Sequence, residues 1–185
     1  MDNKEYFLQE LRKCERQGVD LFIGWLESTD FFESPASTRF HGSHEGGLLE
    51  HSLNVYKAAM MMYNSNLFST HEIGENSVRI CALLHDVCKA MCYATEWKWT
   101  KDDNNKWIQY PAYTFNERQK FGGHGSKSLY FILRYINLSF EEAAAINCHM
   151  GAYDNPKVGD VYEENKLAWL IHVADEWATY YMDGK

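Results

Sequence analysis

Four histidines and two aspartates fall within or at the ends of segments with helical periodicity, where their neighbours are mainly apolar. These six residues are His51, His85, Asp86, His124, His149 and Asp175. A carboxylate in apolar surroundings is costly unless a partner compensates its charge. A metal ion is such a partner, and imidazole together with carboxylate suits Mn, Fe, Co, Ni or Zn. The sequence therefore predicts a centre for one or two divalent transition metals, with Mg also admissible.

The adjacent pair His85-Asp86 follows the apolar run Ala82-Leu83-Leu84. Successive side chains on a helix point about 100° apart, so this pair could face two neighbouring metals or one metal near the helix axis. The two carboxylate oxygens of Asp86 make it the natural bridging ligand. Lys89 lies three residues after Asp86, which places its ammonium on the same helix face. A solvent-facing lysine near a helix end is the alternative.

Five short motifs follow one another along the chain. They are Gly46–Ser52 (GGLLEHS), Ala82–Asp86 (ALLHD), Gly123–Ser128 (GHGSKS), His149–Gly151 (HMG) and Ala174-Asp175 (AD). In order and local context they resemble the HD-domain superfamily of metal-dependent phosphohydrolases, over residues 40–180. A lone His-Asp dipeptide would be weak support, whereas five ordered motifs are specific.

The resemblance implies a role for each of these residues. The first metal would take His51, His85, Asp86 and Asp175, and the second would take Asp86, His124 and His149. Lys89 is similar to the lysine of the HD-x-x-K variant in phosphodiesterase members, where it would lie near the second metal and stabilise phosphate charge. Asp86 and Lys89 are therefore the predicted catalytic residues.

The resemblance also implies the reaction, which is hydrolysis of a phosphomonoester or phosphodiester by metal-activated hydroxide. The substrate would be a small phosphorylated molecule, such as a nucleotide. Two alternatives stay open. The same ligand pattern resembles the HD-fold di-iron oxygenases, such as myo-inositol oxygenase. A non-catalytic module that binds a nucleotide or a structural metal is the other, although six ligands for two metals leave open positions, which favours catalysis.

The loop before the first ligand histidine carries polar residues that could line a substrate pocket. His41, His44 and Glu45 are its candidates for substrate binding. Ser126, together with Gly125 near the start of a helix, could offer backbone amides to an anion. Structural roles in turns are the alternative for all of them.

Four other residues with ligand chemistry are expected to lie outside the metal centre. Cys88 and Cys92 are spaced as two ligands on a helix could be, but small buried hydrophobes are the favoured interpretation. His71 is expected not to be a ligand. His172 lies three residues before Asp175 on the same helix face, so it could support a ligand without touching the metal.

Hydrophobic periodicity predicts an all-α protein, and the resemblance implies that its helices form an HD-domain helical bundle. Helices are expected over residues 6–26, 48–63, 77–90, 124–137, 139–149 and 165–181, with a loop over 151–160. Ser139 with Glu142 three residues later is typical of a capping box at a helix start. We expect a single HD domain over residues 1–185, with its core at 40–180 and a helical extension at 1–37.

A small β-hairpin insertion is expected around residues 93–113, where aromatic residues alternate on both sides of a polar turn. Its tryptophans Trp97, Trp99 and Trp107 are expected to pack one face onto the helices. A lid that stacks a base over the site is the alternative.

The chain is acidic, with a formal net charge of −8 and a pI of about 5.4. Proteins that grip nucleic-acid backbone usually present a basic surface, so the charge argues against stable duplex binding. No apolar run approaches the roughly 20 residues of a membrane span, and the charged first residues do not resemble a signal peptide. The five cysteines form no CxxC pair and are expected to be reduced thiols of a cytoplasmic protein, monomeric or homodimeric.

Overall fold

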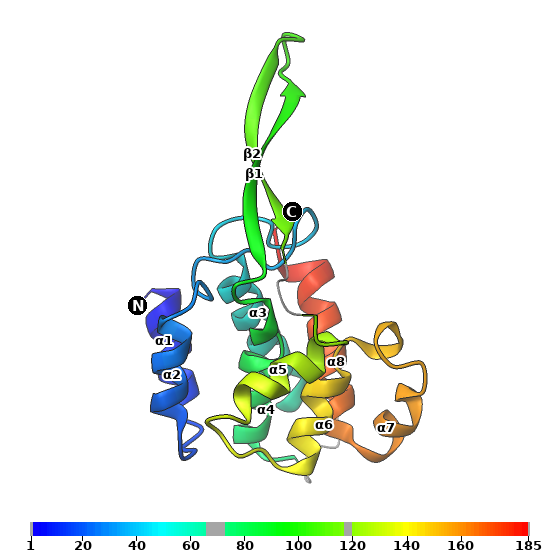
Figure 1. Cartoon of the computed structure of the whole chain (residues 1–185). Coiled ribbons are helices and arrows are strands. Elements are labelled where there is room, and N and C mark those ends of the chain that lie inside the picture. Colours follow the sequence, from blue (N-terminus) through cyan, green and yellow to red (C-terminus); the bar gives the residue numbers. More distant parts are fainter. Residues whose placement is uncertain (1, 66–72, 117–119, 185) are drawn as a thin grey trace.

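The computed structural model describes residues 2–65, 73–116 and 120–184. Helices form the body, and one two-stranded hairpin projects from it (Figure 1). The helices are α1 Asn3–Arg12, α2 Val19–Glu27, α3 Gly47–Tyr63, α4 Glu75–Leu84, α5 His124–Ile132, α6 Phe140–Cys148, α7 Val158–Glu164 and α8 Lys166–Trp177. The strands are β1 Tyr93–Lys101 and β2 Trp107–Phe115, and short helical turns lie at Val87–Lys89 (η1), Gly151–Tyr153 (η2) and Ala178–Met182 (η3). The prediction of an all-α fold with a small hairpin is confirmed.

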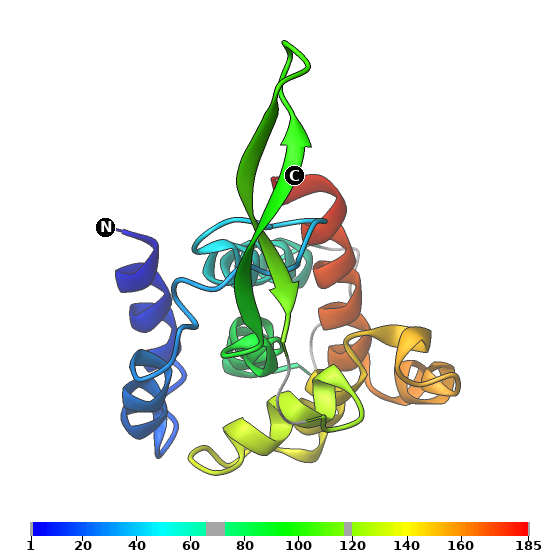
Figure 2. The ribbon, with the colours of Figure 1, turned by 45° about the horizontal axis from the view of Figure 1, so that its top comes forward.

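The two helices α1 and α2 replace the single helix expected over residues 6–26. They lie side by side at one flank of the body (Figures 1 and 2). Gly18, just before α2, has φ +90°, and a Cβ there would collide with the backbone of Tyr135. Helix α1 already ends at Arg12, and the left-handed conformations of Glu15 and Gly18 prevent one continuous helix through the segment before α2. The prediction of one continuous helix is therefore wrong.

Helix α3 packs against other helices on several sides. It contacts α1, α4, α8 and η3, while α6 packs against α5 and α8. The core between these helices consists of aliphatic and aromatic side chains, among them Phe7, Phe22, Leu48, Leu53, Ile80, Leu83, Leu84, Ile132, Ile146 and Ile171. Packing on several sides therefore fixes the positions of the helices that carry the predicted ligands.

Several helix ends differ from the expected ones. Helix α4 ends at Leu84, before the pair His85-Asp86, and α5 and α8 also end earlier than expected. Part of the loop expected over 151–160 is helical, because Val158 of α7 is buried against the core. The capping box at Ser139 and Glu142 is confirmed. None of the described helices combines the length and the apolar character that crossing a membrane requires.

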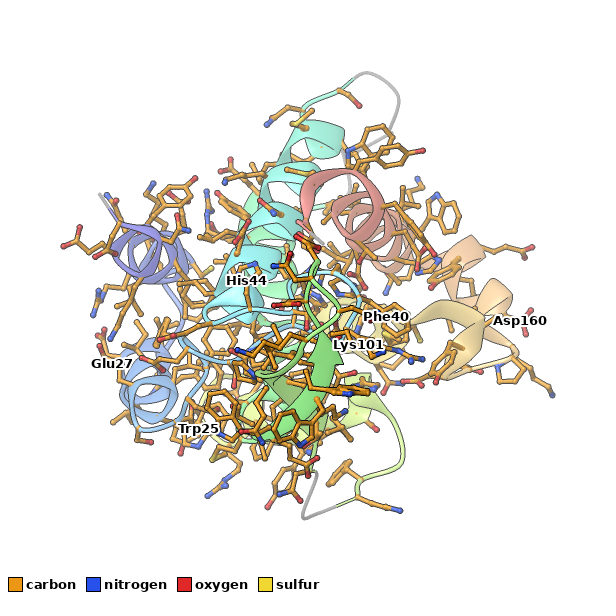
Figure 3. The ribbon with its side chains drawn as sticks, turned by 90° about the horizontal axis from the view of Figure 1, so that it is seen from above. Trp25, Glu27, Phe40, His44, Lys101 and Asp160 are labelled. Carbon is orange, nitrogen blue, oxygen red and sulfur yellow. The ribbon has the colours of Figure 1, made fainter. Side chains whose placement is uncertain are left out.

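The hairpin pairs β1 and β2 antiparallel, from Tyr93↔Phe115 to Lys101↔Trp107. Cross-strand partners share a face of the sheet, so Trp97, Trp99 and Trp107 lie on the same face. These tryptophans are 66%, 62% and 61% exposed. The expectation that they pack onto the helices is wrong, because the hairpin projects beyond the helical body (Figures 1 and 2). Seen from above, Lys101 near its far end lies over the middle of the body (Figure 3).

Candidate metal centre

His51 lies about one turn into α3, and two glycines shape the start of that helix. Gly46 has φ +77°, which favours glycine. Gly47 lies so close to Gly42 that a Cβ would collide with the Gly42 carbonyl oxygen. These contacts direct the chain from the loop into α3. The imidazole of His51 is thereby buried.

His85 and Asp86 enter the same space from the end of α4. The ring nitrogen Nδ1 of His85 donates to the Ala82 carbonyl at 2.9 Å, which leaves Nε2 facing the site. This Nε2 atom lies 3.3 Å from Nε2 of His51. Oδ2 of Asp86 lies 3.5 Å from His85 Nε2 and 3.6 Å from His51 Nε2. The turn after α4 thus brings both members of the pair to one point.

Asp175 and His149 complete this group from α8 and from the end of α6. Asp175 Oδ1 lies 3.2 Å from His51 Nε2 and 3.8 Å from His85 Nε2. Nδ1 of His149 donates to the Ile146 carbonyl at 2.7 Å. Its Nε2 atom lies 3.5 Å from Asp86 Oδ1. Five of the six residues expected to bind metal therefore lie together.

The spacing of these atoms suits a bound metal. Two nitrogens on one tetrahedral ion, each at about 2.0–2.1 Å, would lie about 3.4 Å apart. The Nε2 atoms of His51 and His85 lie 3.3 Å apart. Among the described residues, the buried atoms Asp86 Oδ1 and His149 Nε2 have no hydrogen-bond partner. A divalent cation would satisfy both atoms, so the donor set fits a metal.

The charges of the metal-free cluster compensate one another. Burial opposes the charge of His51, but hydrogen bonds to Asp175 and Asp183 outweigh burial and raise its pKa to about 9. Burial also opposes the charge of Asp86, but Lys89 and the neighbouring histidines hold its pKa well below the usual range. His51 therefore carries a proton at neutral pH. A metal that binds His51 must displace this proton.

Asp183 is a member of the site that the sequence does not reveal. Its Oδ2 atom accepts a hydrogen bond from His51 Nδ1 at 2.7 Å, and its Oδ1 atom accepts one from Asn54 at 2.9 Å. The side chain is buried. Asp183 directly follows η3, which places it beside α3. A carboxylate on the far nitrogen of a ligand histidine orients the ring, which is a common arrangement around metals.

His124, the first residue of α5, belongs to a second group of ligand atoms. His124, Cys88 and Asp86 each offer one ligand atom, and these atoms lie within 4.8 Å of one another. Nζ of Lys89 pairs with Asp86 Oδ2 at 2.6 Å, and the lysine side chain is only 11% exposed. The alternative of a solvent-facing Lys89 is therefore excluded. Asp86 is shared by both groups, where a bridging ligand would lie.

A pocket of about 240 Å³ adjoins this second group. It is lined by Cys88, Lys89, Cys92, Phe115, Lys120, Phe121, Gly122, Gly123, His124 and Lys127. Three lysines and no carboxylate occur among these described lining residues, although the whole chain is acidic. The pocket is therefore suited to an anion.

The four residues expected to bind substrate lie in different surroundings. The His41 ring lies 4.9 Å from the His51 ring, beside the metal centre. His44 is exposed, and its ring donates to the Glu45 carbonyl. Glu45 lines a separate cavity. Ser126 donates to a backbone carbonyl in its own turn. Substrate contacts of all four residues stay predictions.

His172 contacts the backbone of the predicted ligand His149. Its Nδ1 atom donates to the His149 carbonyl at 2.7 Å, and its ring lies against Gly151. This arrangement agrees with a supporting role outside the ligand set. His71 lies outside the described residues. All five cysteines are buried and free of disulfides.

Most of the chain matches a known protein family. The family described as HD domain matches residues 48–179, which is more than half of the chain. The chain belongs to the HD domain family. HD domains bind divalent metals, and the histidine and aspartate groups of this HD domain could hold one.

A curated relative resembles part of this HD domain. Over 63 residues the chain is 36% identical to the dihydroneopterin 2',3'-cyclic phosphate phosphodiesterase of Methanocaldococcus jannaschii. The match covers 33% of this chain and 25% of the relative, so the chain spans about a quarter of the relative's length. No solved structure matches the chain significantly. The HD domain and this relative together support metal-dependent phosphohydrolase activity.

Proposed function

We propose that the protein is a metal-dependent phosphohydrolase that cleaves a small, nucleotide-like phosphate ester, either a monoester or a diester. One observation carries the proposal. Asp86 belongs to both groups of ligand atoms and pairs with Lys89, which lines the lysine-rich pocket. Clustered metal ligands and a confined ammonium are groups that stabilise charge on a reacting phosphate.

The proposed ligand sets follow the family resemblance. His51, His85, Asp86 and Asp175 would hold the first metal, and Asp86, His124 and His149 would hold the second. Mn, Fe, Co, Ni or Zn suits these donors, and Mg is admissible. When bound, such ions lower the pKa of a coordinated water and so supply hydroxide for attack at phosphorus. Asp86 would contribute to both ligand sets, since its Oδ2 atom faces His85 and its Oδ1 atom faces His149.

Lys89 is the proposed catalytic cation. Burial opposes its charge, but Asp86 outweighs burial and raises the pKa of Lys89, so the ammonium stays protonated at neutral pH. The contact with Asp86 also fixes its position at the pocket wall. There the ammonium would stabilise negative charge on the phosphoryl oxygens.

The pocket beside His124 supports an anionic substrate with a ring system. Lys120 and Lys127 add positive charge to that of Lys89. Phe115 and Phe121 line the same pocket and offer apolar ring surfaces for a heterocyclic base. The relative from Methanocaldococcus jannaschii is named for a cyclic phosphate, which belongs to the same class of ester.

We further propose that residues 1–185 act as a single HD domain in the cytoplasm, as a monomer or a homodimer. Five buried cysteines without disulfides support a reducing compartment. The net charge of −8 supports a small substrate rather than a nucleic-acid duplex.

Metal content and turnover test the proposal together. Protein purified without chelator should contain about two equivalents of transition metal, and His124→Ala should contain about one. His44→Ala removes an exposed histidine outside both groups and should keep both metals. The metal-loaded wild type should then hydrolyse at least one member of a panel of mononucleotides, cyclic nucleotides and dinucleotides.

Three results would contradict the proposal. A metal-loaded protein that hydrolyses no member of the panel is not a phosphohydrolase of this substrate class. Oxygen uptake by the iron-loaded protein, measured with an oxygen electrode, would indicate an oxygenase instead. Nucleotide binding without turnover would indicate a non-catalytic module.

A further inference from the structure

Cys88 occupies an unusual position for a small buried hydrophobe. It lies in η1 between Asp86 and Lys89, and only 1% of its surface is exposed. Its Sγ atom lies 3.6 Å from Nδ1 of His124. The Cys88 and His124 atoms and a carboxylate oxygen of Asp86 all lie within 4.8 Å of one another. Three different kinds of metal ligand therefore converge here.

The distance between sulfur and nitrogen matches a shared metal. A tetrahedral zinc ion takes thiolate sulfur at about 2.3 Å and imidazole nitrogen at about 2.0–2.1 Å, which places the two atoms about 3.6 Å apart. The measured distance between Cys88 Sγ and His124 Nδ1 is 3.6 Å. A weak hydrogen bond from the thiol to the imidazole would give a similar distance. The distance between Cys88 and His124 alone therefore does not distinguish a metal site from a hydrogen bond.

Unpartnered buried atoms favour a metal site. Among the described residues, Asp86 Oδ1 has no hydrogen-bond partner, whereas Asp86 Oδ2 pairs with Lys89. Nε2 of His149 is also buried without a hydrogen-bond partner, 3.5 Å from Asp86 Oδ1. Asp86, which belongs to the Cys88 group, thus has an oxygen left for a cation, and a thiol–imidazole hydrogen bond does not satisfy it.

The backbone holds Cys88 and His124 in place. The Cys88 amide donates to Ser128 Oγ of α5 at 3.2 Å. The His124 amide donates to Asp154 Oδ2 at 3.0 Å. Both ligands are therefore positioned by bonds that do not involve their own metal-binding atoms, as expected for a preformed site.

We propose that the thiolate of Cys88 is a ligand of the second metal, together with Asp86 and His124. This inference rests on the proposed metal centre but not on the substrate. The thiol proton would leave to solvent when the metal binds. Because thiolate is a soft ligand, the second position would select Zn, Co or Fe over Mg. The two metal positions would then differ in preference, with nitrogen and oxygen ligands alone at the first.

Cobalt(II) tests the proposal directly, because thiolate bound to cobalt gives a sulfur-to-metal charge-transfer absorption in the near ultraviolet. Titration of metal-free wild type with cobalt(II) should produce this absorption with one of two equivalents. Cys88→Ser should lose the absorption, and the affinity of one equivalent should fall at least roughly tenfold. Cys92→Ser is the matched control, because Cys92 is equally buried and lines the same pocket but lies outside the ligand group. It should keep both the absorption and the affinity.

A measurement on wild type alone guards against a variant that fails to fold. X-ray absorption of the zinc-loaded protein should reveal zinc–sulfur bonds of about 2.3 Å. Averaged over the two zinc ions, the signal should correspond to one sulfur ligand for every two ions. Two bound equivalents without sulfur in either experiment would overturn the role of Cys88 and leave the phosphohydrolase proposal intact. Binding of a single equivalent would overturn the second site. Hydrolysis is measured separately, so its absence would contradict the proposed function and not the ligand assignment.

Discussion

We expect Asp183 to act on the proposed metal centre through its hydrogen bond with His51 and not as a ligand. By accepting a hydrogen bond from Nδ1, it leaves Nε2 of His51 as the atom that faces Asp86 and Asp175. Such a carboxylate fixes the tautomer and increases the basicity of the ligand. The role depends on negative charge as well as on shape.

Replacement of Asp183 by asparagine separates these two contributions. Asp183→Asn keeps the size of the side chain but removes its charge, so we expect the affinity of the first metal to fall roughly 10- to 100-fold. Titration with a metal-sensitive dye measures this change. Asp160→Asn removes an exposed carboxylate of α7, visible at the rim of Figure 3, and should leave the affinity unchanged. Equal affinities for both variants and wild type would refute the role of Asp183.

His51 makes the stability of the metal-free protein depend on pH. Its pKa rises from 6.5 to about 9 on folding, so the protonated ring stabilises the fold fully below pH 6.5, and this stabilisation is lost as the pH rises through 9. The loss would be on the order of 3 kcal/mol. Thermal unfolding between pH 7 and pH 10 should show a falling Tm for the metal-free protein. The metal-loaded protein and metal-free His51→Gln should show a much weaker dependence; an equal slope in all three would contradict this assignment.

The clustering of five candidate ligands could be predicted from the sequence, whereas the positions of two neighbouring residues could not. His51, His85, Asp86, His149 and Asp175 lie within ordered motifs, and the structure brings them together. Asp183 contacts His51 across 132 positions of sequence, and its place depends on η3, a π-helical turn without a local pattern. Cys88 looked like a core residue because thiols are commonly buried. Its position beside His124 arises only from the packing of η1 against α5.

At the scale of elements, the start of α6 is tied to the rest of the body. Ser139 accepts a hydrogen bond from the Glu142 amide, and the Glu142 carboxylate accepts one from the Ser139 amide. The same buried carboxylate pairs with Arg16 and with Ser77 Oγ. One residue therefore caps α6 and links it to α4 and to the segment before α2. Because His149 follows the other end of α6, we expect this link to help position a predicted ligand.

Loss of the cap should weaken the fold and spare the metal centre. Ser139→Ala removes the side-chain acceptor for the first turn of α6, and we expect the free energy of unfolding to fall by about 1 kcal/mol. Urea unfolding followed by circular dichroism measures the change. Ser28→Ala, at the exposed end of α2, should change it by less than about 0.5 kcal/mol. Metal stoichiometry should be the same in both variants, and its loss in Ser139→Ala would show that the cap positions His149.

Helix identities followed from periodicity, but helix ends did not. The predicted start of α3 and the cap of α6 agree with the structure, because local residues determine both. The break before α2 and the start of α7 depend on tertiary contacts, at Gly18 against Tyr135 and at Val158 against the core. The alternation of aromatic residues predicts both strands of the hairpin correctly. It gives no information about whether the aromatic face of the hairpin contacts the helices or solvent.

At the scale of the whole molecule, charge is distributed unevenly. The chain carries a net charge of −8, yet the pocket beside the metal centre combines Lys89, Lys120 and Lys127. A local positive pocket on an acidic protein can attract a small anion while long polyanions are repelled.

Charge reversal at the pocket tests this local field. Lys120→Glu places a carboxylate at the pocket rim, and we expect KM for the phosphorylated substrate to rise roughly three- to tenfold with little change in kcat. Lys157→Glu changes the net charge by the same amount at an exposed position outside the pocket. Steady-state kinetics should show no comparable rise in KM for this control. Equal effects would indicate that net charge, and not the pocket, governs binding.

The exposed hairpin has a consequence for spectroscopy. Five of the six tryptophans, Trp97, Trp99, Trp107, Trp169 and Trp177, are exposed, and Trp25 is half-buried against Phe131. Their emission in the folded protein should therefore already resemble that of tryptophan in water, with acrylamide quenching nearly as effective as in the unfolded chain. Unfolding of the helical body would then be almost silent in tryptophan fluorescence and pronounced in far-ultraviolet circular dichroism. A large blue-to-red shift on denaturation would mean that another surface covers these indoles in solution.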